Sequence, residues 1–173
     1  MNLLIVDDEY LVVEEVVTVT DWELLGITEI YSATNAVSAV RILNEKKIDI
    51  MICDIEMPQT DGLELSKKAK ENFPDLEIVM LTSHAEFNYV RNALRYGCYD
   101  YLLKPVMEDD IIKVMKNLVT KIERERHQAQ LQEEGIVWNQ LKPVWKEKYW
   151  EEMLRGLRDD PNRECEEYEE KQW

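Results

Sequence analysis

The sequence predicts an α/β fold in which helices cover both faces of a doubly wound parallel sheet. Short apolar runs of strand type alternate with segments whose apolar residues recur at helical spacing, and this alternation occurs five times within residues 1–123. Polar residues that carry chemistry follow four of the five runs. Right-handed crossovers between successive strands place the helices in two layers, so we expect a three-layer sandwich.

The strand runs are mostly continuous apolar segments, as expected for strands buried on both faces. They cover residues 3–6, 30–33, 50–53, 78–81 and 101–103. The helices between them carry the apolar sets Val12, Val13, Val16 and Val17; Val37, Val40, Ile42 and Leu43; Leu63, Leu65 and Ala69; and Val90, Ala93 and Leu94. A last helix begins near Glu108. This first domain is long enough to bury a core of its own.

The composition argues against several classes of protein. A formal net charge of -15 disfavours direct binding of nucleic acid or of an anionic membrane surface. No apolar stretch reaches the roughly 20 residues that span a bilayer and no signal-like segment begins the chain, so we expect a cytosolic protein without membrane contact. Cys53, Cys98 and Cys165 lack even pairing and CxxC spacing, so we expect Cys53 and Cys98 to be core residues in a reducing compartment.

Three carboxylates are predicted to meet at one edge of the sheet. Asp7 and Asp8 follow the first strand run and Asp54 follows the third, and ligands of open α/β sheets bind at the carboxyl ends of the strands. Like charges at short range repel, so a cation is expected among them. Oxygen ligands in small number suit Mg²⁺. Asp54 stands alone and is the candidate nucleophile toward phosphorus, with Asp7 and Asp8 as metal ligands.

Two further residues complete a phosphate site. Thr82 follows the fourth run and offers a hydroxyl, and Lys104 follows the fifth and offers a point charge for a phosphate oxygen. Each residue alone has an ordinary role, as a helix cap, a solvated lysine or a good strand former. The order and spacing of all four positions favour a shared site.

Together, these residues resemble the receiver domain of bacterial two-component response regulators. The matching segments are LIVDDE at residues 4–9, CDIEMPQTDG at 53–62, MLTS at 80–83 and YLLKP at 101–105. The resemblance implies a flavodoxin-like fold with strand order 2-1-3-4-5. It also implies that a sensor histidine kinase donates a phosphoryl group from its phosphohistidine to Asp54.

The resemblance assigns metal ligands as well. The positions matching Asp8 and Asp54 bind Mg²⁺ directly, that matching Asp7 binds through water, and that matching Glu56 binds through its backbone carbonyl. Glu56 and His84 lie two residues beyond Asp54 and Thr82, where similar receivers tune the lifetime of the phosphoryl group.

The resemblance further implies a switch. The hydroxyl matching Thr82 moves toward the phosphate, and the ring matching Tyr101 enters the vacated space. The affected face comprises residues 86–96, 100–103 and 108–122, through which similar receivers dimerise.

Two local features of the backbone also match the family. Pro58 and Gly62 bracket a sharp loop beside the nucleophile. The Lys104–Pro105 bond corresponds to the cis peptide of the family.

The rest of the chain is predicted to form a charged helical linker over residues 124–134 and an amphipathic helical segment with an acidic tail over residues 135–173. Heptad-like spacing of Ile111, Met115, Leu118 and Ile122 suggests a short coiled coil in a dimer. Gly135 is expected to interrupt the helix, and Pro143 to start or kink the next one.

The subfamily is suggested by two motifs. DWELLG at residues 21–26 and EEMLRG at residues 151–156 resemble receivers attached to AraC-type helix-turn-helix domains. No basic recognition helix follows, so DNA is expected to be bound only through a C-terminal domain absent from this chain.

Two alternatives remain open. In the first alternative, the receiver is complete as given and acts through protein contacts or phosphorelay. In the second, the chain is a Mg²⁺-dependent phosphohydrolase that uses Asp54 as nucleophile. Haloacid-dehalogenase-like phosphatases require a second Asp two residues after the nucleophile, where this chain has Glu56. The chain also lacks a cap insertion to enclose a small substrate, so we do not expect an enzyme.

Overall fold

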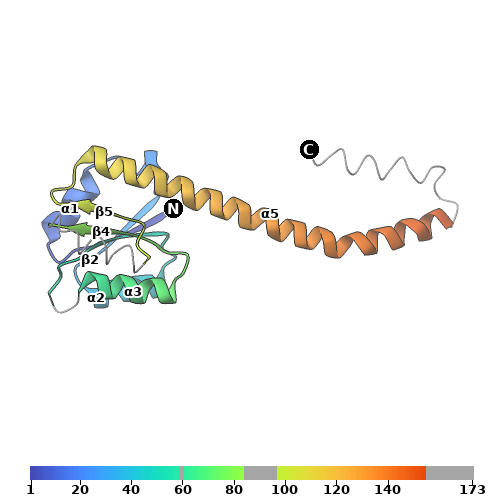
Figure 1. The fold of residues 1–173 in the computed structure, drawn as a ribbon, viewed down its shortest axis with the longest axis horizontal. Coiled ribbons are helices and arrows are strands. Elements are labelled where there is room, and N and C mark those ends of the chain that lie inside the picture. The colour runs from blue at the N-terminus through green and yellow to red at the C-terminus, as the bar shows by residue number, and fades with distance from the viewer. Residues whose placement is uncertain (59–60, 84–96, 155–173) are drawn as a thin grey trace. The chain divides into compact units, whose positions relative to one another are not determined.

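The computed structural model contains a parallel sheet flanked by helices (Figure 1), and its five strands have the order β2-β1-β3-β4-β5. It describes residues 1–58, 61–83 and 97–154, with side-chain environments up to residue 132. The strands are β1 (Asn2–Val6), β2 (Glu29–Ala33), β3 (Ile50–Asp54), β4 (Glu77–Thr82) and β5 (Asp100–Leu103). All four neighbouring pairs are parallel. The predicted three-layer, flavodoxin-like class and its strand order are therefore confirmed.

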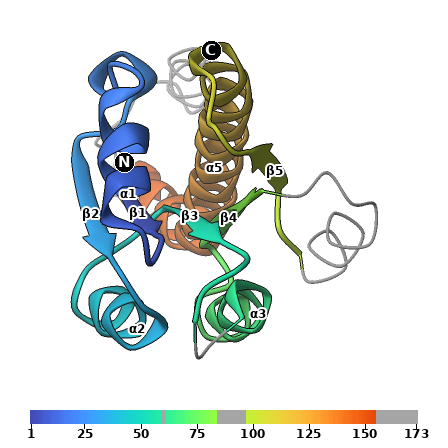
Figure 2. The same ribbon diagram turned by 90° about the vertical axis from the view of Figure 1, so that its left-hand side faces the viewer.

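Helices cover both faces of the sheet (Figure 2). The elements are α1 (Tyr10–Thr18), the 3-10 turn η1 (Glu23–Leu25), α2 (Ala36–Glu45), α3 (Gly62–Asn72) and α5 (Glu108–Leu154). Helices α1 and the start of α5 lie on one face, and α2 and α3 on the other. Side chains cap two of the helices, because Asn35 accepts from the Ser38 N–H and Asp61 from the Leu63 N–H. The helix predicted around Val90 lies outside the described residues.

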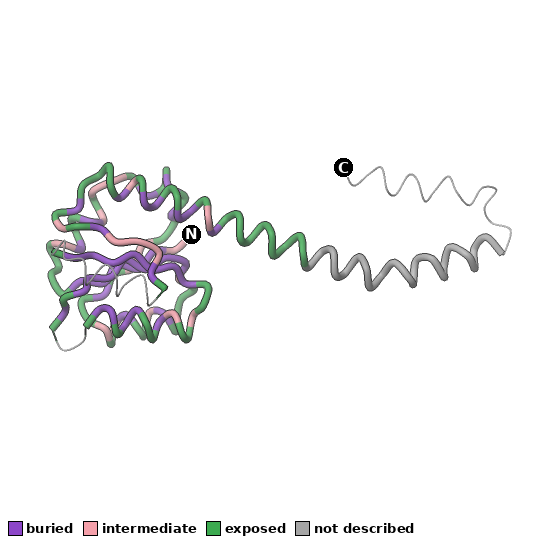
Figure 3. The backbone as a smooth tube through the Cα atoms, viewed as in Figure 1, coloured by how far each residue is buried: buried purple, intermediate pink, exposed green. Residues whose placement is uncertain are grey.

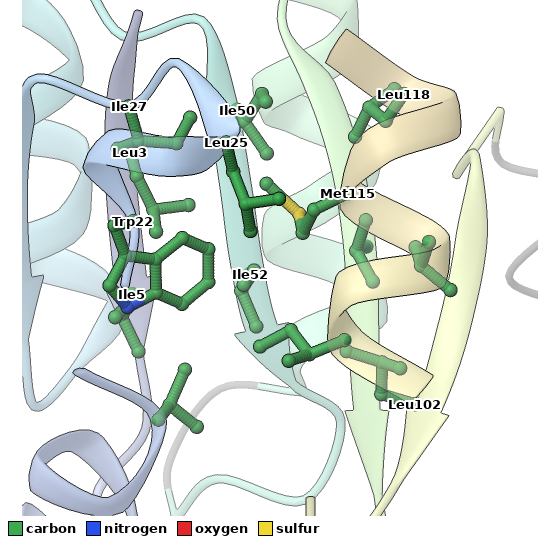
Figure 4. Close-up of a cluster of buried hydrophobic side chains, with 14 of the residues drawn as sticks. Leu3, Ile5, Trp22, Leu25, Ile27, Ile50, Ile52, Leu102, Met115 and Leu118 are labelled. Atoms are coloured by element: carbon green, nitrogen blue, oxygen red, sulfur yellow. The ribbon is translucent and has the colours of Figure 1, made fainter. Parts of the chain in front are cut away.

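Among the residues whose side chains are described, the core consists of two apolar clusters, one on each face of the sheet. Side chains alternate along a strand, so Leu3 and Ile5 join the cluster under α1 and α5, whereas Leu4 and Val6 join the cluster under α2 and α3. Figure 4 shows Trp22, Leu25 and Met115 meeting the strands in the first cluster. The strands carry most of the fully buried residues (Figure 3).

Both predicted core cysteines are confirmed among the described residues. Cys53 is fully buried and Cys98 is 6% exposed, and both belong to the cluster under α2 and α3. Burial raises the pKa of the Cys98 thiol to about 11 and raises the pKa of Cys53 as well, so both stay protonated at neutral pH. Cys165 lies outside the described residues.

The heptad-like set at the start of α5 faces the sheet. Ile111, Met115, Leu118 and Ile122 are at most 5% exposed and pack in the first cluster. Packing against the sheet within the domain therefore accounts for their spacing, which gives no support to a coiled coil at these positions. The compact unit that contains the sheet ends at Ile122, and the described residues from Glu123 to Gln132 are exposed.

The expected interruption of the helix at Gly135 is wrong. Helix α5 continues without a break through Gly135 and Pro143 to Leu154. Within a helix, Gly costs about 1 kcal/mol and Pro about 3 kcal/mol relative to Ala, and a long helix tolerates both. Pro143 has no N–H to donate to the carbonyl of residue 139. The division into residues 1–123, 124–134 and 135–173 stays a prediction.

Replacing Trp22 with Ala should strongly destabilise the domain. The side chain is 5% exposed in the first cluster, and its Nε1–H donates to the Val17 carbonyl at 3.0 Å. We expect Trp22→Ala to lower the free energy of unfolding by about 3–5 kcal/mol. Urea unfolding followed by circular dichroism measures this loss.

The matched control is Leu24→Ala, because Leu24 lies in the same turn and is 83% exposed. It should change the free energy of unfolding by no more than about 0.5 kcal/mol. Equal losses in the two variants would contradict this packing of the Trp22 side chain.

Candidate functional site

The polar residues that follow the strand runs gather at the carboxyl edge of the sheet. Asp7 directly follows β1, and Asp54 and Thr82 are the last residues of β3 and β4. Lys104 directly follows β5, and its N–H donates to the Thr82 carbonyl at 2.9 Å. Because β1 and β4 both pair with β3, Asp54 lies between the ends of its two neighbouring strands.

The three predicted carboxylates form one cluster. One oxygen from each of Asp7, Asp8 and Asp54 lies within 4.8 Å of the others. Asp7 is fully buried, Asp54 is 3% exposed and Asp8 is exposed. The cluster therefore combines two nearly dry carboxylates with one that faces solvent.

Lys104 bridges the two buried carboxylates. Its Nζ lies 2.6 Å from Asp7 Oδ2 and 2.8 Å from Asp54 Oδ1. Only 14% of its side chain is exposed. One ammonium group thus faces two carboxylates, and the cluster keeps an excess of negative charge.

The protonation of this pair follows from burial and charge. Burial raises the pKa of Asp54, the contact with Lys104 opposes this, and Asp7 and Asp8 add to the rise, so the pKa lies above its usual value. For Lys104, burial lowers the pKa, but hydrogen bonds and charge contacts with Asp54 and Asp7 outweigh it and raise the pKa overall. Lys104 therefore stays cationic.

Gly62 is required here for a reason different from the predicted permissive backbone. It begins α3, and its φ is not in the left-handed region. A Cβ added to Gly62 would lie 1.8 Å from the Asp54 carbonyl oxygen, and the Gly62 N–H donates to the Ile55 carbonyl at 2.9 Å. The missing side chain thus lets the start of α3 approach the end of β3.

The other predicted residues have varied surroundings. Thr82 is 1% exposed, while Tyr101 is half-buried and packs against the cluster under α2 and α3. The side chains of Glu56 and Pro58 are exposed. The Lys104–Pro105 peptide is cis. His84 and residues 59–60 lie outside the described residues.

Two contacts at the site were not anticipated from the sequence. The Glu9 N–H donates to Asp7 Oδ1 at 2.9 Å and orients this carboxylate. Lys104 was expected to meet a phosphate oxygen, and in this structure it pairs with Asp7 and Asp54. The run of acidic residues after β1 signals the first contact only weakly, because a two-residue turn of this kind follows many aspartates.

Comparisons with known proteins agree with this fold. The response regulator receiver domain family matches residues 3–116. The transcriptional regulatory protein YesN of Bacillus subtilis is 34% identical over 124 residues, which are 72% of this chain and 34% of YesN. The response regulator SaeR of Staphylococcus aureus is 32% identical over 127 residues, which are 73% of this chain and 54% of SaeR.

A solved structure is similar as well. The REC domain of AraT, a response regulator from Geobacillus stearothermophilus, has a TM-score of 0.68 at 30% identity, covering 72% of this chain and 97% of that domain. The doubly wound parallel sheet is the fold of this class of protein, the receiver domains. The chain belongs to the response regulator receiver domain family of two-component systems.

The matched region is only part of the relatives. The chain spans about a third of the length of YesN and about half of that of SaeR. Among the described residues, no helix is both long enough and apolar enough to cross a membrane.

Removing the charge of Lys104 should destabilise the domain in EDTA. Lys104→Met leaves Asp7 and Asp54 buried without their common cation, so we expect a loss of about 3 kcal/mol in the free energy of unfolding, the lower end of the cost of breaking a buried ion pair. Urea unfolding measures it. Lys113→Met, at an exposed position of α5, is the control and should lose little. A stable Lys104→Met protein would show that the bridge does not hold the cluster.

Proposed function

We propose that this chain is a phosphorylation switch in which Asp54 accepts a phosphoryl group from the phosphohistidine of a sensor histidine kinase. The observation that carries the proposal is the Asp54–Lys104 pair at the carboxyl edge of the sheet, flanked by Asp7 and Asp8. Membership of the receiver family supports it, as do the similar proteins YesN, a transcriptional regulatory protein, and SaeR, a response regulator.

The residues present fit a divalent cation. Three carboxylates supply oxygen ligands within 4.8 Å of one another, which is the donor set that Mg²⁺ prefers. We assign direct contacts to Asp8 and Asp54, a contact through water to Asp7, and one to the backbone carbonyl of Glu56. When bound, Mg²⁺ offsets the charge on the transferring phosphoryl group.

The side chains then have distinct tasks in the transfer. An Asp54 carboxylate oxygen forms a bond to phosphorus while the bond from phosphorus to the histidine nitrogen breaks, and the imidazole leaves with that electron pair. The Lys104 ammonium, already 2.8 Å from Asp54 Oδ1, is in reach of a phosphoryl oxygen on this carboxylate. Thr82 supplies a hydroxyl on the adjacent strand.

The output is proposed to be control of transcription. In this account the Thr82 hydroxyl moves to the phosphoryl group and Tyr101 follows, which changes the face of β5 and α5. Glu56 and His84 are the proposed determinants of the phosphorylated lifetime. DNA would be bound by a region that lies outside the receiver domain in the transcriptional relatives. The cytosolic location stays a prediction.

Phosphorylation should require Asp54 and Mg²⁺. We expect incubation with a small phosphoryl donor and Mg²⁺ to add one phosphoryl group, measured by intact-protein mass spectrometry, because Asp54 is the proposed nucleophile of the carboxylate cluster. Asp54→Asn or EDTA should abolish the addition. Asp61→Asn is the matched control, since Asp61 caps α3 and lies outside the cluster. An addition that persists in Asp54→Asn would refute the assignment.

Phosphorylation should also change the solution mass. We expect beryllofluoride with Mg²⁺ to shift the protein from monomer to dimer in light scattering, because Leu103 on the switching face is 44% exposed and Met107, which directly precedes the α5 part of that face, is 61% exposed. Met107→Ser should weaken the dimer. Val37→Ser, at an exposed position of α2, should not.

Three results would be informative in this experiment. A shift that Asp54→Asn abolishes supports the switch. A constant dimer would assign dimerisation to the linker helices instead. A constant monomer would contradict an output through dimerisation.

A further inference from the structure

A second charged cluster lies at the opposite edge of the sheet from Asp54. Glu77 is the first residue of β4, whose last residue is Thr82. Glu77 is only 7% exposed, although it is a carboxylate at a strand end. Its N–H donates to the Asp49 carbonyl at 3.0 Å, so its backbone is fixed in the sheet.

Two lysines from opposite faces of the sheet meet this carboxylate. Lys70 of α3 lies 3.0 Å from Glu77 Oε1 and also donates to the Leu76 carbonyl at 2.7 Å. Lys121 of α5 lies 3.0 Å from Glu77 Oε2. Each carboxylate oxygen thus has its own ammonium, and Glu77 joins both helical layers to β4.

Lys121 has a second partner. Its Nζ lies 5.4 Å from the centre of the Tyr99 ring, within the range of a cation–π contact. Tyr99 directly precedes β5, and its N–H donates to the Ile78 carbonyl of β4 at 2.7 Å. One side chain of α5 therefore contacts the start of β4 and the entry to β5.

Lys121 stands where α5 leaves the core. Its neighbour Ile122 is buried in the cluster under α1 and α5, and the described residues from Glu123 onward are exposed. Breaking the pair leaves Oε2 of this buried carboxylate without its ammonium, while Lys70 stays at Oε1, so separating Lys121 from Glu77 costs free energy. The Glu77–Lys121 pair lies at the other end of the strands from Asp54 and takes no part in the proposed phosphoryl transfer.

We propose that the Glu77–Lys121 pair is the coupling through which β4 and β5 hold and move the linker helix α5. Thr82 lies at the other end of β4 from Glu77, and Tyr101 lies two residues after Tyr99. The two switch residues thus lie on β4 and β5, and Lys121 contacts the first residue of β4 and the residue that precedes β5, so a displacement of either strand would act on this side chain. Lys121 is thus a positioning residue, and this role rests on the proposed function.

Hydrogen exchange of residues 118–132 tests the coupling, measured with Mg²⁺ in the absence and presence of beryllofluoride. The variants are Lys121→Met, Glu77→Gln and the conservative Lys121→Arg. Lys116→Met, one turn earlier at an exposed position of α5, is the control. Fluorine NMR on the same samples reports whether beryllofluoride occupies Asp54.

We expect beryllofluoride to bind all variants as it binds the parent protein and to change exchange in α5 of the parent. Lys121→Met and Glu77→Gln should lose most of this change, and resting exchange near residue 121 should rise at least about tenfold, the factor for about 1.4 kcal/mol. Lys121→Arg should restore the change, and Lys116→Met should keep it. A merely structural role would alter resting exchange but preserve the response.

The remaining outcomes separate two failures. If beryllofluoride binds and α5 responds equally in Lys121→Met, or does not respond in the parent protein, the coupling is overturned and the proposed function stands. If the parent protein binds no beryllofluoride, the proposed function falls and the coupling falls with it.

Discussion

The structure depends on offsetting the negative charge of the carboxylates that lie at the carboxyl ends of the parallel strands. Asp7 and Asp54 are nearly dry, and the described contacts give them one common ammonium, that of Lys104. Two buried negative charges and one positive charge leave an excess that favours a further cation. Burial, with a smaller contribution from Asp7 and Asp8, raises the pKa of Asp54, and the contacts with Asp54 and Asp7 keep Lys104 charged. In our account, the site is therefore prepared for a metal ion and a phosphoryl group before either arrives.

The rest of the domain places this cluster and connects it to the helices. The doubly wound sheet brings the ends of β1, β3 and β4 together, and the absent side chain of Gly62 lets α3 begin against Asp54. At the opposite edge, Glu77 pairs with lysines of α3 and α5. The strands thus have an acidic end that suits chemistry, and at their other end Glu77 secures two helices through its lysine partners.

Much of the fold was predictable from sequence because its signals are local. Continuous apolar runs and helical spacing predicted the sheet and its layers, and an aspartate or lysine after a run marked the carboxyl edge. The roles of Gly62 and Glu77 were not predictable, since both depend on contacts between elements distant in sequence. The break expected at Gly135 was wrong because local propensity is a weak constraint within a long helix.

Fluorine NMR of beryllofluoride is the most direct test of Asp54 as the phosphoryl acceptor, because it reports occupancy of the carboxylate without a kinase or an output domain. With Mg²⁺, we expect bound fluoride resonances that vanish on adding EDTA and are absent in Asp54→Asn. Asp61→Asn should keep them, since Asp61 lies outside the cluster. Absence of bound resonances in the parent protein, or their persistence in Asp54→Asn, would contradict the account of Asp54 as the acceptor.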